Sequence, residues 1–190
     1  FKEGRVFGTV EWRVTPQWLI NAGLFVGQHS RAGTYTAPRF MVNWLPTPEH
    51  TFRVGVTESI RAPNLSEYDA DVRLYGPGGE LLLHEYGATG QVKPEELRST
   101  EIGYVGRFPS QNLTIDARLY HERMDGVIKV QRYVSLETGF NTRDYVNLTG
   151  LTLAGLEYQL RWKPFDSTEI WLNQHFSDLS WDNPRWNRND

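Results

Sequence analysis

Hydrophobic and polar residues alternate at every second position in several windows of this chain, including residues 18–26 and 52–57. The alternation is clearest in residues 152–163, where one face is apolar and the other polar: Ala154, Leu156, Tyr158, Leu160 and Trp162 against Glu157, Gln159, Arg161 and Lys163. No long window keeps the period near 3.6 that an amphipathic helix requires. The pattern therefore predicts amphipathic β-strands and an all-β fold.

Turn residues divide the chain into eight predicted strands that form an antiparallel, up-and-down meander. The strands are predicted at 5–14, 18–28, 37–46, 51–60, 97–108, 113–133, 143–163 and 168–177. Short Pro-containing turns at 15–17, 46–49, 109–112 and 164–167 alternate with longer connections at about 28–37, 60–97, 134–143 and from 178 onward. Short turns at one end of a sheet and long loops at the other are typical of a transmembrane β-barrel, whereas a Greek-key sandwich mixes loop lengths at both ends.

The two faces of the predicted strands carry different residues. Aromatic residues beside the short turns fall on the outward face, as expected for a girdle at the lipid head groups: Trp12, Trp18, Trp44, Phe108 and Trp162. Charged residues in the middle of the strands fall on the inward face: Glu11, Arg13, Arg53, Glu101, Arg107, Asp116, Arg118, Glu122, Glu157 and Arg161. In a wide barrel these charges would line a polar lumen, and in a soluble sandwich they would lie on the solvated face.

Composition narrows the possible functions. The 190 residues contain no Cys, carry a formal net charge of -3 and hold no run of Lys or Arg, so neither a disulfide scaffold nor nucleic-acid binding is expected. A mean hydropathy of -0.53 does not separate a soluble domain from a barrel. There is no GxSxG, HExxH or phosphate-loop motif, and the five His have no ligand spacing. We therefore expect no catalytic residues, no cofactor and no metal site.

Two other interpretations remain open at this stage. A soluble β-sheet carbohydrate-binding module or glycoside-active enzyme would bury the apolar face in a dry core: Ile20, Leu24, Val54, Leu156 and Leu160. Loop carboxylates such as Asp69 with Asp71, or Glu95 with Glu96, would then be the candidates for glycosidase chemistry. A complete eight-stranded membrane barrel fits the strand count, but both chain ends would lie on the long-loop side.

Two ordered motifs resemble the barrel of TonB-dependent receptors of Gram-negative bacteria. The first is Arg61-Ala62-Pro63-Asn64-Leu65-Ser66-Glu67, at the end of a strand. The second is Lys93-Pro94-Glu95 followed by Glu101-Ile102-Gly103-Tyr104, at the start of the next. Pro63 and Pro94 lack an N–H, so they should end the strand pairing on either side of the loop. The resemblance extends from about Phe7 to Phe176.

This resemblance implies a fragment of a larger bacterial outer-membrane receptor. Residues 1–190 would form about eight strands of a barrel of roughly 22 strands, without the plug domain and the closing strands. The whole receptor would import a scarce nutrient, most simply a ferric siderophore or another iron chelate, with energy from the TonB complex acting through the plug. Its partners would be this ligand, the TonB complex and outer-membrane lipid. The lumen-facing or plug-facing residues would include Arg53, Glu101, Arg107, Arg118, Glu157 and Arg161.

The connection at 60–97 is far longer than a hairpin needs and is the candidate ligand-binding loop. It contains stacking faces and hydrogen-bonding groups suited to a polar chelate: Tyr68, Arg73, Tyr75, His84, Glu85 and Tyr86. Arg73 is the first candidate for an anionic chelate. The alternative is that the loop simply packs over the barrel mouth. Glycines on inward positions (Gly55, Gly103 and Gly155) would either let a plug approach closely or mark bends.

Overall fold

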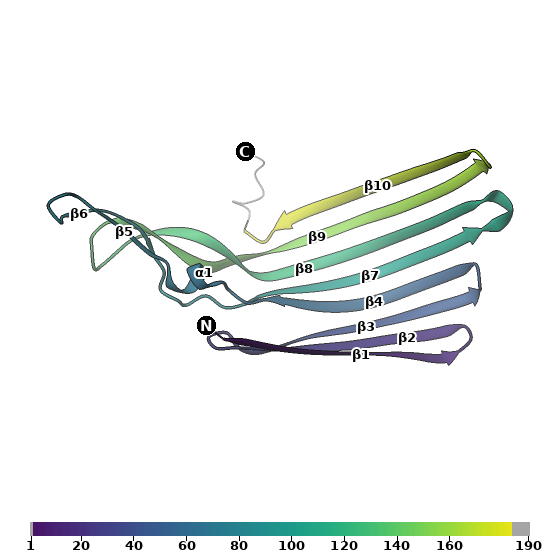
Figure 1. Ribbon diagram of the computed structural model, residues 1–190, viewed down its shortest axis with the longest axis horizontal. Coiled ribbons are helices and arrows are strands. Elements are labelled where there is room, and N and C mark those ends of the chain that lie inside the picture. The colour runs from purple at the N-terminus through teal and green to yellow at the C-terminus, as the bar shows by residue number, and fades with distance from the viewer. Residues whose placement is uncertain (1, 184–190) are drawn as a thin grey trace.

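The computed structural model describes residues 2–183, which form one curled antiparallel sheet with a projecting arm (Figure 1). The strands of the sheet are β1 (Glu3–Thr15), β2 (Trp18–His29), β3 (Gly33–Thr47), β4 (His50–Arg61), β7 (Glu95–Phe108), β8 (Leu113–Val134), β9 (Asn141–Phe165) and β10 (Thr168–Trp181). Their order is β1-β2-β3-β4-β7-β8-β9, with β10 paired to the other edge of β9. The eight predicted strands and their up-and-down order are confirmed.

The connections differ from the prediction in two places. The expected long connection at 28–37 is a tight turn, because Gly33 adopts a φ of +77° and His29 Nδ1 accepts hydrogen bonds from the N–H groups of Arg31 and Ala32. The loop at 60–97 contains the short helix α1 (Leu65–Asp69) and a hairpin of β5 (Asp71–Tyr75) and β6 (Leu81–Gly87). A one-turn 3-10 helix, η1 (Pro109–Gln111), forms the turn before β8. Long and short connections therefore do not alternate strictly.

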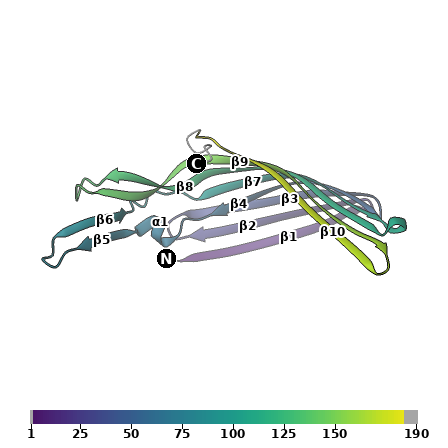
Figure 2. The same cartoon turned by 90° about the horizontal axis from the view of Figure 1, so that it is seen from above.

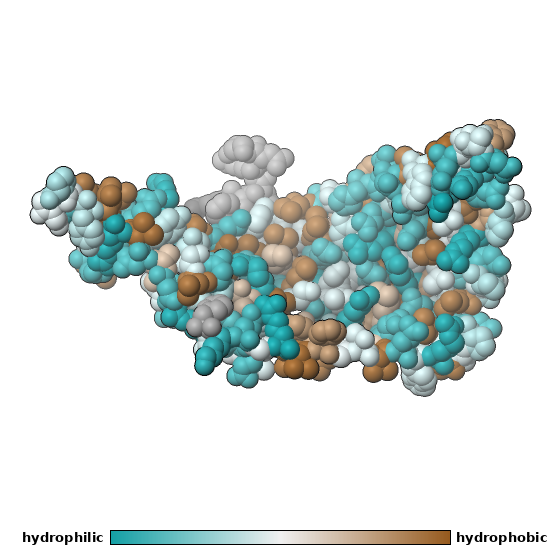
Figure 3. All heavy atoms as spheres, in the orientation of Figure 1, coloured by the Kyte–Doolittle hydropathy of each residue, from teal (hydrophilic) through white to brown (hydrophobic). Residues whose placement is uncertain are grey.

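The strand register separates polar from apolar side chains across the sheet. On one face Arg53, Gly103 and Arg118 are successive cross-strand neighbours, and Arg118 is opposite Glu157. The other face carries Val54, Ile102, Leu119 and Leu156 at the equivalent positions. Figure 2 shows that the sheet curls, and Figure 3 shows hydrophilic residues gathered over its strands. We call the concave polar face the trough.

The apolar face is not covered by a second layer within the described residues. Val54 is 57% exposed, Ile102 60% and Leu119 55%. On the trough side, by contrast, Met41 and Tyr120 are buried although only the curl of the sheet encloses them. A soluble sandwich would bury the apolar face against another sheet. Within residues 2–183, Leu24 and Val54 therefore do not lie in the dry core that a soluble module requires.

Aromatic rings near the short turns form a continuous row on the apolar face. The ring centroids are 6.1 Å apart in Trp18–Trp44, 5.4 Å in Trp44–Phe52 and 5.0 Å in Phe52–Tyr104. Exposed rings in this position match the aromatic belt of membrane proteins. The other three predicted girdle residues also face outward, because the strand register and the alternation of side chains place them on the apolar face: Trp12, Phe108 and Trp162. Among the described residues, no helix is long and apolar enough to cross a membrane.

Glycines on the trough face make room for side chains of the sheet itself. A Cβ on Gly155 would lie 2.5 Å from the Tyr120 hydroxyl oxygen and 2.6 Å from the Phe176 carbonyl oxygen. A Cβ on Gly103 would meet the side chain of Arg53. These glycines therefore have a local packing role that neither of the two sequence interpretations anticipated.

Candidate functional site

The residues of the two sequence motifs meet at the long-loop end of β4 and β7, in what we call the rim cluster: Arg61, Glu67 and Glu95. Arg61 binds Glu67 in a bidentate ion pair with both N···O distances at 3.0 Å, and its Nε lies 2.5 Å from Glu95 Oε2. Glu67 and Glu95 are 8% and 9% exposed. The Ile128 N–H donates to Glu95 Oε1 at 2.7 Å. The motif thus joins the loop entry, the loop exit and β8.

Capping and proline positions explain why the rim cluster forms here. Asn64 Oδ1 accepts the Glu67 N–H at 3.0 Å and Glu67 Oε2 accepts the Asn64 N–H at 2.7 Å, which is a capping box for α1. β4 ends two residues before the fully buried Pro63, and β7 begins directly after Pro94. Both proline predictions are therefore confirmed. The Lys93 N–H donates to Asn147 Oδ1 at 2.8 Å, which ties the loop exit to β9.

The electrostatics of the rim cluster are set by burial and by Arg61. Burial by itself raises the pKa of Glu95, but the hydrogen bonds from Arg61 and from the Ile128 N–H overcome this effect, so the pKa is lowered overall. The hydrogen bonds to Glu95 and Glu67 raise the pKa of Arg61. Glu95 therefore stays ionised beside Arg61 near neutral pH, and the rim cluster is a structural fastener at the base of the loop.

The predicted ligand loop is folded onto the ends of β8 and β9, and together they form the arm at the left of Figure 1. Arg73 donates to Glu137 in a bidentate pair at 2.8 and 2.9 Å and to Asp71 at 2.8 Å. His84 is 2% exposed, its Nδ1 lies 3.1 Å from Thr138 Oγ1 and its Nε2 lies 3.2 Å from Asp71 Oδ1. We call this group the arm clamp. Two of the six predicted ligand residues, Arg73 and His84, are thus engaged within the arm.

A second set of contacts fastens the base of the arm to β9. The rings of Tyr86 and Tyr145 stack with centroids 5.7 Å apart, and the Arg143 guanidinium lies 5.5 Å from the Tyr86 centroid while pairing with Glu85. Asp144 accepts hydrogen bonds from the N–H and the hydroxyl of Thr89 at 3.1 and 2.7 Å. Sequence reasoning missed Arg143, Asp144 and Tyr145, because they lie more than 50 residues from their partners.

The two remaining predicted ligand residues occupy different settings. Tyr68 on α1 is 4% exposed, stacks on His29 with centroids 6.1 Å apart and lies beneath the Arg31 guanidinium at 5.3 Å. Tyr75 is 55% exposed at the end of β5. The six residues therefore do not form one cluster: Tyr68 is buried at the rim, Tyr75 is open to solvent, and the other four belong to the arm contacts.

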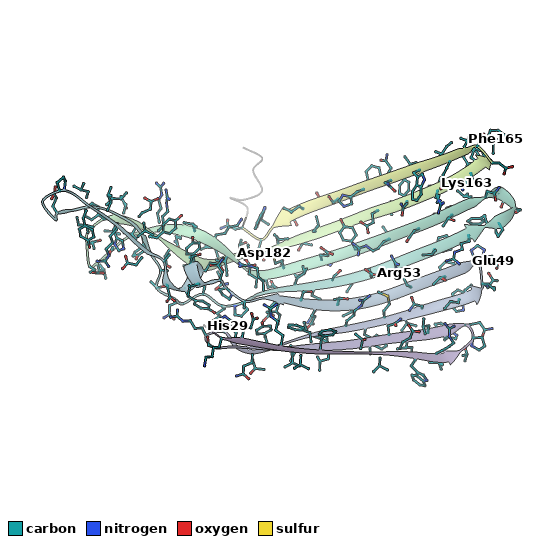
Figure 4. The ribbon with its side chains drawn as sticks, in the orientation of Figure 1. His29, Glu49, Arg53, Lys163, Phe165 and Asp182 are labelled. Atoms are coloured by element: carbon teal, nitrogen blue, oxygen red, sulfur yellow. The ribbon has the colours of Figure 1, made fainter. Side chains whose placement is uncertain are left out.

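The trough contains a continuous ion network across neighbouring strands (Figure 4 labels Arg53). Arg118 pairs with Glu101 at 3.0 Å and with Glu157 at 2.8 Å, and Arg53 lies 3.5 Å from Glu101 and 3.7 Å from Asp116. Four members of this network line a hollow of about 420 Å³ that also reaches His175 on β10: Arg53, Asp116, Arg118 and Glu157. Arg161 pairs with Glu169 at the short-turn end, while Arg107 has no side-chain ion pair within the described residues.

The described part of the chain holds no group of three or more His, Asp or Glu side chains that could bind a metal ion. The carboxylates of the rim cluster and of the ion network across the trough instead have Arg partners. This arrangement supplies polar contacts and electrostatic complementarity to whatever fills the trough.

Comparisons with known proteins agree with this architecture. The family model described as "TonB dependent receptor-like, beta-barrel" matches residues 2–190. The siderophore receptor PirA from Pseudomonas aeruginosa is similar with a TM-score of 0.78 and 18% identity, over 95% of this chain and 35% of that chain. A mutant of the ferric enterobactin receptor PfeA from the same organism is similar with a TM-score of 0.74 and 18% identity, over 92% of this chain and 26% of that chain. The FrpB iron transporter from Neisseria meningitidis is similar with a TM-score of 0.69 and 14% identity, over 94% of this chain and 26% of that chain.

No curated protein matches the chain. The chain spans about a third or less of each of these solved structures, and the low identities establish the fold alone. A curled antiparallel sheet with an apolar outer face, an aromatic row and a polar trough defines the wall of a transmembrane β-barrel. The chain belongs to the TonB-dependent receptor-like β-barrel family. This is a family of outer-membrane receptors and transporters of Gram-negative bacteria and not a family of enzymes.

Proposed function

We propose that the chain is part of an outer-membrane receptor that takes up a ferric siderophore or a similar iron chelate with energy from the TonB complex. The observation that carries the proposal is the polar trough on one face of a wall whose other face is apolar. Membership of the TonB-dependent receptor family supports it, and so does the similarity of the fold to siderophore receptors and to an iron transporter.

In this proposal residues 1–190 are one part of the barrel domain, and the plug and the closing strands lie in other parts of the receptor. The plug would contact the trough network around Arg53, Glu101 and Arg118, and the TonB complex would act through the plug. The proposal is supported by the open hollow of about 420 Å³ beside these charges, which is large enough for side chains of another domain.

Ligand capture would fall to the long-loop side. We propose that Tyr75 offers aromatic contact to the chelate, while Arg73, His84 and Tyr86 act by holding the arm in place. The exposure of Tyr75 supports the first role, and the ion pairs and burial of the arm clamp support the second. Arg73 would then affect ligand affinity through the arm, not by direct charge pairing.

Deletion of the gene for the whole receptor tests the uptake. Cells are grown under iron limitation with a ferric catecholate, a ferric hydroxamate or cyanocobalamin as probes. Loss of growth on one iron chelate, restored by the intact gene, is the expected result. Unchanged growth on both iron chelates, or expression that does not respond to iron, would redirect the proposal to cobalamin or a sugar. Recovery of the full-length protein in the soluble fraction without detergent would contradict membrane location.

A further inference from the structure

β3 and β4 separate from each other toward the long-loop end of the sheet (Figure 1). Their paired register runs from Thr47↔His50 only as far as Arg39↔Thr57. β3 nevertheless continues to Gly33 in register with β2, and β4 continues to Arg61 in register with β7. Within the described residues, no backbone hydrogen bond joins 33–38 to 58–61. The wall therefore contains an opening, which we call the window.

Local chemistry explains why the strands part at this height. Pro38, which has no N–H to donate, is the first residue of β3 beyond the paired region. Tyr35 turns away from β4: its ring covers Gly27, and its hydroxyl donates to Glu3 Oε1 at 2.5 Å. The pairing between β3 and β4 thus loses one backbone donor and one cross-strand side-chain contact.

The top of the window is closed by contacts between the turn after β2 and α1. Arg31 forms an ion pair with Asp69, and the rings of His29 and Tyr68 stack. The window is therefore framed on four sides, with the Arg39↔Thr57 pair below, β3 and β4 at the sides and this turn above. Such a frame holds the two strands apart and leaves their facing backbone groups free.

Hollows lie on both sides of the window. An outward hollow of about 420 Å³ is lined by Thr34, Thr36 and Glu58 among others, and a trough-side hollow of about 310 Å³ is lined by Glu3 and Arg61 among others. Tyr35 and Ile60 border both. The outward hollow is the larger and carries three carboxylates and two guanidiniums: Glu58, Glu96 and Asp125 with Arg98 and Arg123.

The height of the window places it beyond the apolar band. On the outward face of β4 the side chains pass from Val54 and Val56 to Glu58, and on β7 from Ile102 to Arg98, whose side chain is 68% exposed. Unpaired backbone groups facing hydrocarbon would be costly, whereas beside this charged surface they are accessible from water.

We propose that the window binds an extended segment of a separate polypeptide as an added strand between β3 and β4. Free N–H and C=O groups repeat along both sides at the spacing of a β-strand, a pattern that another backbone matches and a small solute does not. In the outward hollow Glu58 and Asp125 already pair with Arg98 and Arg123, whereas Glu96 has no ion pair within the described residues, which favours a segment with a basic side chain pointing outward. This binding is separate from ligand uptake and does not depend on it.

The opening itself is tested with paired cysteines in the full-length receptor, since this chain has no Cys. Continuing the register from Arg39↔Thr57 would place Thr36 opposite Ile60, so Thr36→Cys with Ile60→Cys reports whether the strands meet. Val42→Cys with Val54→Cys, a pair in the ladder on the same face, is the control. We expect the control pair to oxidise readily and the window pair to stay reduced, because room for a strand separates them by about 10 Å. Equal oxidation of both pairs would overturn the proposal.

The occupant is tested with a fluorescein-labelled hexapeptide of alternating threonine and lysine and with its N-methylated analogue, which keeps the charge but loses backbone donors. We expect the first peptide to bind the receptor in micelles at least about tenfold more tightly than the second, and to protect amides in 34–37 and 58–61 from hydrogen exchange. Equal binding of the two peptides, or no binding, would overturn the proposal. So would protection of these amides before any peptide is added, because the receptor itself would then fill the window.

Discussion

The sheet and the arm of this protein are held together in different ways. The sheet is formed by long ladders in which each strand pairs with a neighbour along most of its length, as in the β7–β8 register from Glu96↔Asp125 to Phe108↔Leu113. Within the arm, the hairpin of β5 and β6 joins β9 through the parallel bridge Tyr86↔Arg143, and otherwise through ion pairs, stacked rings and hydrogen bonds that involve side chains.

This difference determines how each region responds to change. A ladder distributes its stability over many backbone hydrogen bonds, so a single surface side chain contributes little to it. The arm depends on a few charge-assisted contacts, each made by an individual side chain. The rim cluster lies between the two regions, because Arg61 belongs to the end of a ladder and also fastens the loop.

The largest expected effect is at this junction. Arg61→Ala would leave the nearly buried carboxylates of Glu67 and Glu95 without their cation, and we expect the free energy of unfolding to fall by about 2 kcal/mol. Urea unfolding of the full-length receptor in micelles measures it. The control is Arg98→Ala, which removes an exposed pair with Glu58 and should cost less than about 0.5 kcal/mol. Equal losses in both variants would show that the rim cluster is no more than a surface ion pair.

A second test addresses the ladder itself. Gly155→Ala would bring a Cβ to within 2.6 Å of the Phe176 carbonyl oxygen, so β9 or β10 must shift, and we expect a loss of about 1 to 2 kcal/mol in the same unfolding experiment. The matched variant Gly8→Ala meets no atom within 4 Å and should be neutral within about 0.5 kcal/mol. An unfolding midpoint for Gly155→Ala equal to that of Gly8→Ala would contradict the close approach.

A smaller effect, confined to the arm, is expected from Arg73→Ala. Loss of the three hydrogen bonds to Glu137 and Asp71 should speed amide exchange in 71–87 by at least about tenfold while the exchange of the sheet is unchanged. Arg132→Ala removes the same charge from an exposed site on β8 that has no ion pair within the described residues. If both variants exchange alike, the arm is not held by the clamp.

The smallest expected effect is a change in the mobility of the arm as the pH falls. The hydrogen bonds from Arg73 lower the pKa of Glu137 below its ordinary 4.5 and that of Asp71 below its ordinary 3.8. Because these pKa values are depressed, the stabilisation is fully present above the ordinary values and is lost as the pH falls through the folded-state ones. A nitroxide attached at Leu136→Cys, a fully exposed position, should become more mobile below about pH 4. The same label in the Arg73→Ala background should show no such transition.

Much of the sheet follows from local patterns. The alternation in 152–163 predicts which side chains of β9 face the trough, and the positions of Pro63 and Pro94 predict where pairing stops on each side of the loop. The prediction of a long connection at 28–37 was wrong. The buried His29 side chain accepts hydrogen bonds from two N–H groups and holds a tight turn, and such a contact leaves no pattern in the sequence. The hairpin of β5 and β6 was missed within a segment that reads as loop.

The ligand residues chosen from the sequence stay a prediction, and the structure changes what can be expected of them. The guanidinium of Arg73 is suited to binding an anion, but it pairs with Glu137, 64 residues away along the chain. Arg143 and Tyr145 escaped attention because they lie on a strand that the pattern assigned to the wall. No local signal shows that β9 extends past the sheet to meet β6.

By itself the sequence determined the strands, their two faces and the family motifs, because side-chain alternation and proline are local properties of the backbone. Only the tertiary structure decided that Arg61 joins both motifs, that Arg73 and His84 lie inside the arm and that β3 and β4 part above Arg39. These features depend on which distant residues the curl and register bring together, and such contacts depend on the whole sheet, not on any one segment of it.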